Sequence, residues 1–210
     1  MKNSWKKLLT KPLTHSSRSR ENLLSMRFFG FQFVRLTSIL ECACGTGLLS
    51  AVIAPKCRLL TSTDFSRKML KKAEKNCAAF HNIRFAQADI TALPYPDSSF
   101  DKVVAGNVIH LLDNPLTALG ELNRVCKDGG KLIIPTYMNN DSKGKTSGFA
   151  GAVGKAGADF KRQFTVDSYK QFFLDAGYID VKVSLADGRI PCAVAVMRKM
   201  GKMSPRPSEE

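Results

Sequence analysis

From residue 38 onward, the sequence alternates short apolar runs with segments in which apolar residues recur every three or four positions. The short runs predict buried strands at residues 38–43, 58–63, 83–87, 100–107 and 131–136. The segments between them predict helices that begin near residues 46, 66 and 115, the second of which runs to about Phe80. Residues 128–130 (DGG) predict a tight turn into the strand at 131–136. This alternation of strands and helices predicts a parallel sheet with helices on both faces.

The last third of the domain predicts one more helix and two strands. The helix is expected from Thr165 to Gly177, and the strands at 180–186 and 190–198 around an Asp187–Gly188 turn. The predicted fold class is therefore α/β, a mostly parallel seven-stranded sheet that ends in an antiparallel hairpin.

We divide the chain into a basic amino-terminal segment at 1–37, one domain at 38–200 and a tail at 201–210. The amino-terminal segment has no clear period, and we expect it to be partly disordered or lid-like. Residues 139–164, rich in glycine, lysine and serine, are expected to be a variable insertion on the substrate side. The tail is expected to be disordered.

The composition is that of one soluble globular domain. Of the 210 residues, 44% are hydrophobic and 24% are charged, and no apolar run reaches the ~18 residues that cross a bilayer. The six cysteines lie in or beside predicted elements, which favours reduced thiols and a cytoplasmic protein. An organelle transit peptide is the minor alternative. Cys42 and Cys44 have no second pair or nearby histidine, so no metal site is expected.

The chain is strongly basic. Its formal net charge is +14, and residues 1–38 hold eight lysines and arginines against one glutamate. Such an excess suits nucleic acid or an anionic membrane surface. Because the charges are scattered and do not alternate with stacking aromatic side chains, a solvated basic surface is favoured. Nucleic-acid binding and weak association with a membrane surface stay open as alternatives.

The segment LECACGTGLLS, which begins at Leu40, predicts a buried strand, a tight glycine turn and the start of a helix. Gly45 and Gly47 let a ligand approach the backbone closely, and Glu41 lies just before the turn. A dinucleotide fingerprint needs a third glycine where this chain has Ser50. The segment resembles motif I of the class I S-adenosylmethionine-dependent methyltransferases.

Four further segments extend this resemblance over about residues 38–136, and more loosely over the hairpin. They are residues 63–70 (TDFSRKML), 88–90 (ADI), 99–104 (SFDKVV) and 122–132 (LNRVCKDGGKL). Within class I, the chain looks most like the small-molecule branch that includes the ubiquinone and menaquinone biosynthesis methyltransferases. The resemblance implies a Rossmann-like fold and methyl transfer from S-adenosylmethionine to a small-molecule acceptor, with S-adenosylhomocysteine as product.

The candidate cofactor contacts lie where predicted strands end, and parallel strands end at one edge of a sheet. After the second strand, the Asp64 carboxylate suits both ribose hydroxyls and the Phe65 ring suits adenine. After the third strand, Asp89 suits the exocyclic amine of adenine, and the backbone amide of Ile90 suits a ring nitrogen.

The methionyl end carries an ammonium group beside the sulfonium. Backbone carbonyls around Cys42 and near Asn107, supported by the Glu41 carboxylate, suit these positive charges. The resemblance implies that the cofactor contacts include Glu41, Gly45, Gly47, Asp64, Asp89 and Asn107.

His110, just after the fourth strand, is the one candidate base, against the alternative that it packs or caps a helix. Asp101 opens that strand, at the edge away from the ligand, and is expected to be structural. The segment Gly106–His110 lacks an Asn/Asp-Pro-Pro-Tyr/Phe motif, which weighs against amino-methylation of DNA bases.

Two other functions stay open. The basic charge permits an RNA-directed methyltransferase or an RNA binder. The atypical segment 1–37 permits a methyltransferase fold with impaired catalysis, because the family usually has an amino-terminal region that closes over the cofactor.

Overall fold

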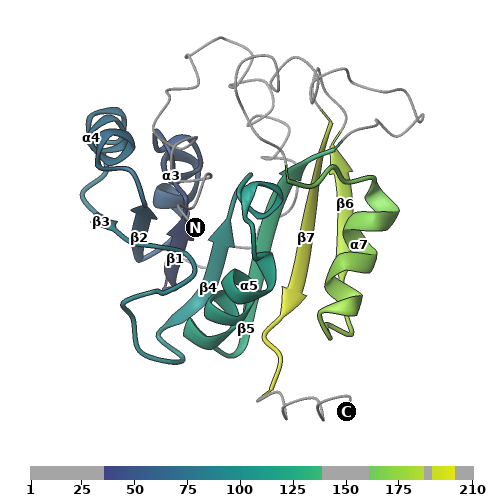
Figure 1. Ribbon diagram of the computed structural model, residues 1–210. Coiled ribbons are helices and arrows are strands. Elements are labelled where there is room, and N and C mark those ends of the chain that lie inside the picture. The colour runs from purple at the N-terminus through teal and green to yellow at the C-terminus, as the bar shows by residue number, and fades with distance from the viewer. Residues whose placement is uncertain (1–35, 139–160, 187–190, 202–210) are drawn as a thin grey trace.

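The structure, a computed structural model, describes residues 36–138, 161–186 and 191–201. These residues contain a seven-stranded sheet with the strand order β3-β2-β1-β4-β5-β7-β6 (Figure 1). The strands are β1 (Ser38–Cys42), β2 (Leu59–Asp64), β3 (Ile83–Gln87), β4 (Phe100–Ala105), β5 (Cys126–Tyr137), β6 (Lys182–Ala186) and β7 (Cys192–Arg198). The helices are α3 (Leu48–Ile53), α4 (Arg67–Asn76), α5 (Pro115–Val125) and α7 (Val166–Asp175), with short 3-10 helices η1 (Ala54–Lys56) and η2 (Ile109–Leu111).

The pairing of the strands confirms the predicted fold class. Strands β1 to β5 pair in parallel, whereas β7 is antiparallel to both β5 and β6. The strand order reverses at β1: the chain first adds β2 and β3 on one side of β1 and then adds β4 and β5 on the other side. A crevice for ligands is expected at such a switch point, outside the carboxyl ends of the strands.

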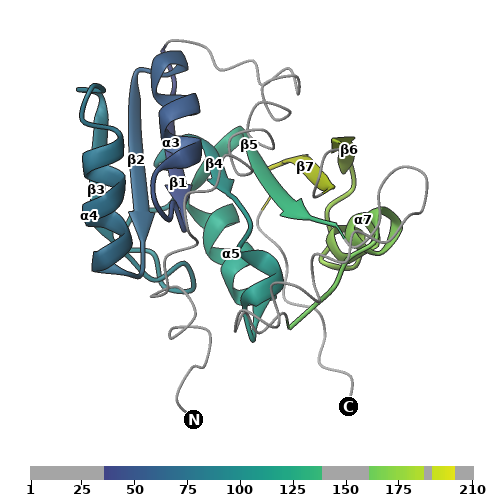
Figure 2. The ribbon, with the colours of Figure 1, turned by 90° about the horizontal axis from the view of Figure 1, so that it is seen from above.

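Both faces of the sheet are apolar and covered by helices. Along β1, Ile39 packs into the cluster that includes α3, and Leu40 packs into the larger cluster that includes α5 and α7. Figure 2 shows α3 and α5 on opposite sides of the sheet. Burial on both faces explains why apolar residues stand next to each other in the sequence, at Ile39 and Leu40 of β1 and at residues 103–105 of β4.

Local sequence signals set several element ends. Ser66 caps α4, since its hydroxyl accepts a hydrogen bond from the Met69 amide at 3.3 Å. Thr165 caps α7 in a reciprocal arrangement with Ser168. Helix α5 begins at Pro115, as predicted, because proline lacks the amide that a first helical residue leaves unused.

Several predicted boundaries were wrong, among them the end of β4 at Ala105 and the starts of β6 at Lys182 and β7 at Cys192. Helix α3 begins at Leu48 rather than 46, because the glycine turn occupies the two preceding residues. Helix α4 ends at Asn76, four residues early, with Cys77 as its C-cap. The predicted turn at residues 128–130 lies inside β5, where the pairing with β4 shifts register and Gly129 has φ of 74°.

Several predictions concern segments outside the described residues. They are the amino-terminal segment up to residue 35, the insertion at 139–160, the Asp187–Gly188 turn and the tail after 201. Within the described ranges all six cysteines are free and buried, and no group of three or more His, Cys, Asp or Glu residues is arranged so that it could hold a metal ion. No helix in this part of the chain is long and apolar enough to cross a membrane.

Candidate functional site

The turn after β1 has an unusual backbone. Ala43, Gly45 and Gly47 have φ values of 55°, 56° and 82°, so left-handed residues alternate along it. A Cβ atom on Gly47 would lie 2.9 Å from the Cys77 sulfur, which fixes glycine there for packing against α4. A Cβ atom on Gly45 would meet no atom of the described residues within 4 Å. The turn therefore packs tightly at Gly47 and presents an open backbone surface at Gly45, as close approach of a ligand requires.

Asp64, at the end of β2, connects this turn to the neighbouring strand. Its Oδ2 accepts a hydrogen bond from the Gly45 amide at 2.8 Å, and its Oδ1 accepts one from the Ser66 amide at 2.8 Å. Burial raises the pKa of Asp64, and the two amide hydrogen bonds oppose that rise. Each oxygen keeps a further lone pair, although Asp64 is only 1% exposed, and a ligand contact by this carboxylate stays a prediction.

Glu41 lies beneath the turn and is fully buried. Its Oε2 accepts hydrogen bonds from the hydroxyls of Ser50 at 2.5 Å and Ser62 at 2.9 Å. Among the described residues, its Oε1 has no hydrogen-bond partner. Burial, opposed by the serine hydrogen bonds, raises the pKa of Glu41 to about 7. Part of the Glu41 population is therefore protonated at neutral pH.

The end of β3 supplies the candidate adenine contacts. Asp89 forms a tight turn in which Oδ1 accepts hydrogen bonds from the Thr91 amide at 2.9 Å and the Thr91 hydroxyl at 2.7 Å. The Ala92 amide donates to the Asp89 carbonyl at 3.0 Å. The side chain of Ile90 is buried in the larger core cluster, which anchors the turn.

Asn107, at the end of β4, has φ of 53° and ties β4 to β5. Its amide donates to the Pro135 carbonyl at 2.8 Å, and its side-chain Oδ1 accepts from the Tyr137 amide at 3.1 Å. The short polar side chain suits this left-handed conformation. Its position at this edge of the sheet matches the prediction, and a ligand contact by Asn107 stays a prediction.

His110 lies in η2 and is buried. Burial lowers its pKa to about 4, so the imidazole is neutral at pH 7. Its carbonyl accepts hydrogen bonds from the amides of Lys161 and Arg162. A neutral imidazole can accept a proton, but this environment makes it a weak base.

The other two candidate residues, Cys42 and Phe65, lie at the carboxyl ends of β1 and β2 and differ in their surroundings. The Cys42 side chain is buried in the core, and burial raises the pKa of its thiol to about 12. Cys42 therefore offers a ligand only its backbone. Phe65 is half-buried and packs against the larger core cluster beside Asp64.

At the opposite edge of the sheet, Asp101 is structural, as predicted. Its Oδ2 accepts hydrogen bonds from the amide of Ser38 at 2.7 Å and from the Ser38 hydroxyl at 2.9 Å. Its Oδ1 binds the Lys127 ammonium at 2.8 Å. These contacts join the starts of β1 and β4.

Residues 40–134 match the model of a family described as a methyltransferase domain. This part of the chain is therefore similar to a methyltransferase domain. This confirms the family resemblance, and the strand order agrees with it.

Named relatives share this domain. A demethylmenaquinone methyltransferase of Clavibacter sepedonicus is 38% identical over 96 residues, which are 46% of this chain and 39% of that protein. The N-methyltransferase NodS of Bradyrhizobium japonicum WM9, solved with S-adenosyl-L-homocysteine, superimposes with a TM-score of 0.67 at 17% identity over 93% of this chain and 96% of that one. A SAM-dependent methyltransferase from Aquifex aeolicus gives a TM-score of 0.63 at 19% identity over 94% and 98%. The two structural similarities establish the fold of the methyltransferase domain.

Sequence reasoning missed the groups that hold the site in place. Ser62 faces Glu41 because the parallel register of β1 and β2 pairs these two residues. A polar residue inside an apolar strand was the available signal, but the register that gives it a partner is not local. Arg124 lies in a segment that carries the family resemblance, but its role there was not predicted; within the described residues its guanidinium makes five hydrogen bonds.

Proposed function

We propose that the methyltransferase domain binds S-adenosylmethionine and transfers its methyl group to a small-molecule acceptor. The observation that supports this most directly is the hydrogen bond between the Gly45 amide and Asp64, beside the open surface of Gly45. It places a carboxylate next to a backbone surface that a ligand can reach. That combination suits the ribose of an adenosyl ligand.

The other residues at this edge would hold the rest of the cofactor. Asp89 and the Ile90 amide would bind adenine, with Phe65 beside the ring. In its ionised form, Glu41 would place negative charge near the methionyl end, with backbone groups of Cys42 and Asn107 alongside. When bound, S-adenosylmethionine supplies a methyl group already activated on a positively charged sulfur, so alignment and exclusion of water are the main tasks left to the protein.

His110 is the proposed base for an acceptor that must lose a proton. Because its pKa is about 4, it would remove a proton only from an acceptor that becomes acidic during transfer. An acceptor that is already ionised needs no base.

We propose an acceptor class to test from the name of a matched relative. Because a matched relative is a demethylmenaquinone methyltransferase, the first acceptor to test is demethylmenaquinone. The matched segment covers 39% of that protein, so the acceptor is part of the proposal.

Isothermal titration with S-adenosylhomocysteine tests the cofactor site. We expect Asp64→Ala to weaken binding at least tenfold, because it removes the ribose acceptor and the support of the Gly45 amide. Asp101→Ala is the matched control, since it removes a carboxylate that also binds a backbone amide, at the far edge. It should keep its affinity within about twofold. Equal losses in both variants, or no binding by the natural chain at millimolar ligand, would contradict the proposal.

A second candidate function, RNA binding, is favoured by one helix. Five lysines and arginines and one glutamate lie on the exposed surface of α4, and no ion pair joins these cations to an acid within the described residues. Such a face could contact phosphates. RNA binding predicts a steep salt dependence of tRNA affinity that the double variant Lys71→Glu/Lys72→Glu reduces. A shallow dependence that this variant leaves unchanged would remove the candidate.

A further inference from the structure

The connection between β3 and β4 carries both candidate adenine contacts. Residues 88–99 contain no helix or strand, and their one isolated bridge joins Asp89 to Ala92. A segment of this length without regular structure needs other contacts to hold one conformation, because ordering a residue costs about 1–2 kcal/mol.

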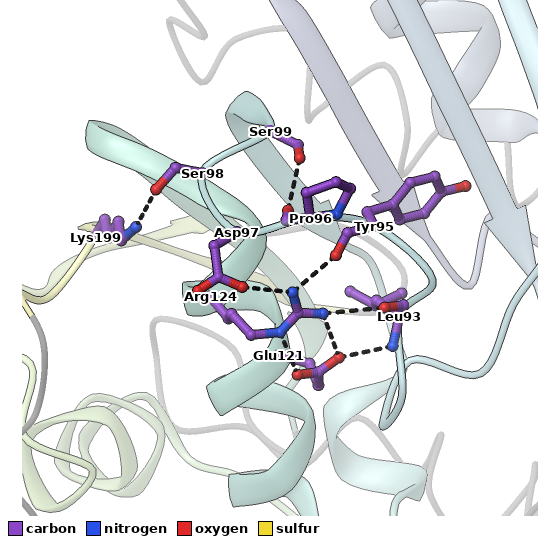
Figure 3. Close-up of polar contacts among 9 residues, drawn as sticks. All are labelled: Leu93, Tyr95, Pro96, Asp97, Ser98, Ser99, Glu121, Arg124 and Lys199. Atoms are coloured by element: carbon purple, nitrogen blue, oxygen red, sulfur yellow. Dashed lines mark hydrogen bonds and ion pairs between the residues drawn. The ribbon is translucent and has the colours of Figure 1, made fainter.

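Arg124, in the last turn of α5, supplies such contacts (Figure 3). Its Nη1 donates to the Tyr95 carbonyl at 2.8 Å, and its Nη2 donates to the Leu93 carbonyl at 3.0 Å. Nη1 also binds the exposed carboxylate of Asp97 at 2.8 Å. One planar guanidinium therefore holds three residues of the connection against α5.

Glu121, one turn earlier on α5, completes the arrangement. Its two oxygens accept hydrogen bonds from Arg124 Nε at 2.7 Å and Nη2 at 2.8 Å, a bidentate pair that fixes the guanidinium plane. Its Oε2 also accepts the Leu93 amide at 2.7 Å. Both polar backbone groups of Leu93 are thus bound by this side-chain pair. The hydrogen bonds to Arg124 lower the pKa of Glu121, which keeps the carboxylate charged at neutral pH.

The held segment begins directly after the adenine contacts. The turn at Asp89 closes at Ala92, and Leu93 is the next residue. Downstream, the Ser98 and Ser99 amides donate to the carbonyls of Arg124 and Val125 at 2.9 and 2.8 Å. The turn at Asp89 is therefore fixed on one side by β3 and on the other by the end of α5.

We propose that Arg124 and Glu121 are positioning residues for adenine recognition, acting through Leu93 to hold Asp89 and Ile90 in their binding geometry. The inference rests on the proposed function, because it assumes that Asp89 reads the exocyclic amine of the cofactor. Loss of the pair leaves the connection free to move, and ligand binding must then order it.

The experiment compares two ligands that differ only at the base. S-Adenosylhomocysteine carries the exocyclic amine that Asp89 accepts, whereas S-inosylhomocysteine carries an oxygen there. The natural chain should bind the adenosyl ligand at least tenfold more tightly. In Arg124→Gln this preference should fall to less than threefold, with most of the loss in affinity for the adenosyl ligand. A general loss of stability would weaken both ligands equally and leave their ratio unchanged.

Two further variants complete the test. Lys127→Met is the control, since it breaks the ion pair with Asp101 just beyond the same helix without touching residues 88–97; its preference should match that of the natural chain. Where Arg124→Gln does not fold, Glu121→Gln makes the same test, because it removes the charge that orients the guanidinium.

The outcomes separate the two proposals. A natural chain that binds neither ligand overturns the proposed function. A natural chain that binds both ligands equally, or an Arg124→Gln variant that keeps the full adenine preference, overturns the positioning role while leaving cofactor binding intact.

Discussion

The backbone amide of Gly45 and the carboxylate of Asp64 are joined by a hydrogen bond of 2.8 Å. Gly45 belongs to the turn after β1, and Asp64 is the last residue of the neighbouring β2. The bond sets the position of the turn relative to the carboxylate. The two parts of the candidate ribose site are therefore fixed together by the fold.

The two glycines of this turn should respond differently to the same substitution. Gly47→Ala should lower the free energy of unfolding by about 2–4 kcal/mol for two reasons. The alanine would be strained in the left-handed conformation of this residue, and its Cβ would lie only 2.9 Å from the Cys77 sulfur. Gly45→Ala should cost only about 1 kcal/mol of strain, since its Cβ meets no atom in the part of the chain that the structure describes, but should weaken S-adenosylhomocysteine binding at least tenfold. Urea unfolding and titration calorimetry measure the two effects. Equal destabilisation by both variants would contradict the packing difference.

Ala43 has φ of 55°, a conformation that glycine adopts without strain. We expect Ala43→Gly to raise the free energy of unfolding by about 0.5 kcal/mol, because relief of left-handed strain exceeds the added entropy of the unfolded chain. The same substitution at Ala51, inside α3, should lower it by about 1 kcal/mol. Thermal unfolding of the pair checks the sign. A destabilised Ala43→Gly would show that the turn gains more from the methyl group than it loses to strain.

Glu41 makes stability depend on pH. Its pKa is raised to about 7 from an ordinary 4.5, so the folded state keeps a proton that the unfolded state releases between those values. The stabilisation from this group is fully present below pH 4.5 and is lost as the pH rises through about 7. Glu41→Gln has no carboxyl group at this position, so it does not lose this stabilisation as the pH rises. Its free energy of unfolding, relative to the natural chain, should therefore rise by about 2 kcal/mol between pH 5 and pH 8.

The comparison at two pH values isolates Glu41 from other groups. Burial lowers the pKa of His110 to about 4, so its contribution is lost as the pH falls from 6.5 towards 4, the opposite direction. That contribution is common to both chains and cancels in the difference. Glu74→Gln, on the exposed surface of α4, is the matched control and should give parallel profiles. Parallel profiles for Glu41→Gln as well would rule out the raised pKa.

The buried cysteines should be unreactive in the folded protein. Burial raises the pKa of Cys57 to about 11 and that of Cys126 to about 12, so their thiols are neutral at pH 8 as well as covered. We expect no rapid reaction with an aromatic disulfide reagent in buffer, and six equivalents in denaturant. A thiol that reacts at once in buffer would show that the fold opens locally at that residue.

Much of the fold could be predicted because its signals are local. The apolar periodicity placed every strand of the sheet, and Ser66 and Thr165 identified the starts of two helices. Strand ends share one edge in any parallel sheet, so Asp64 and Asp101 could be assigned to opposite edges before the strand order was known. A glycine turn after a buried strand likewise predicts its own backbone geometry.

Tertiary structure decided which of these residues touch. The pairing of Glu41 with Ser62 depends on the register of two strands separated by a helix, and no periodicity specifies that register. Arg124 reaches Leu93 and Tyr95 only because α5 packs beside the connection to β4. Sequence by itself determined the elements and the chemistry offered at their ends, since both follow from neighbouring residues. The partners that orient those groups, and the burial that shifts their pKa values, arise only when distant segments pack together.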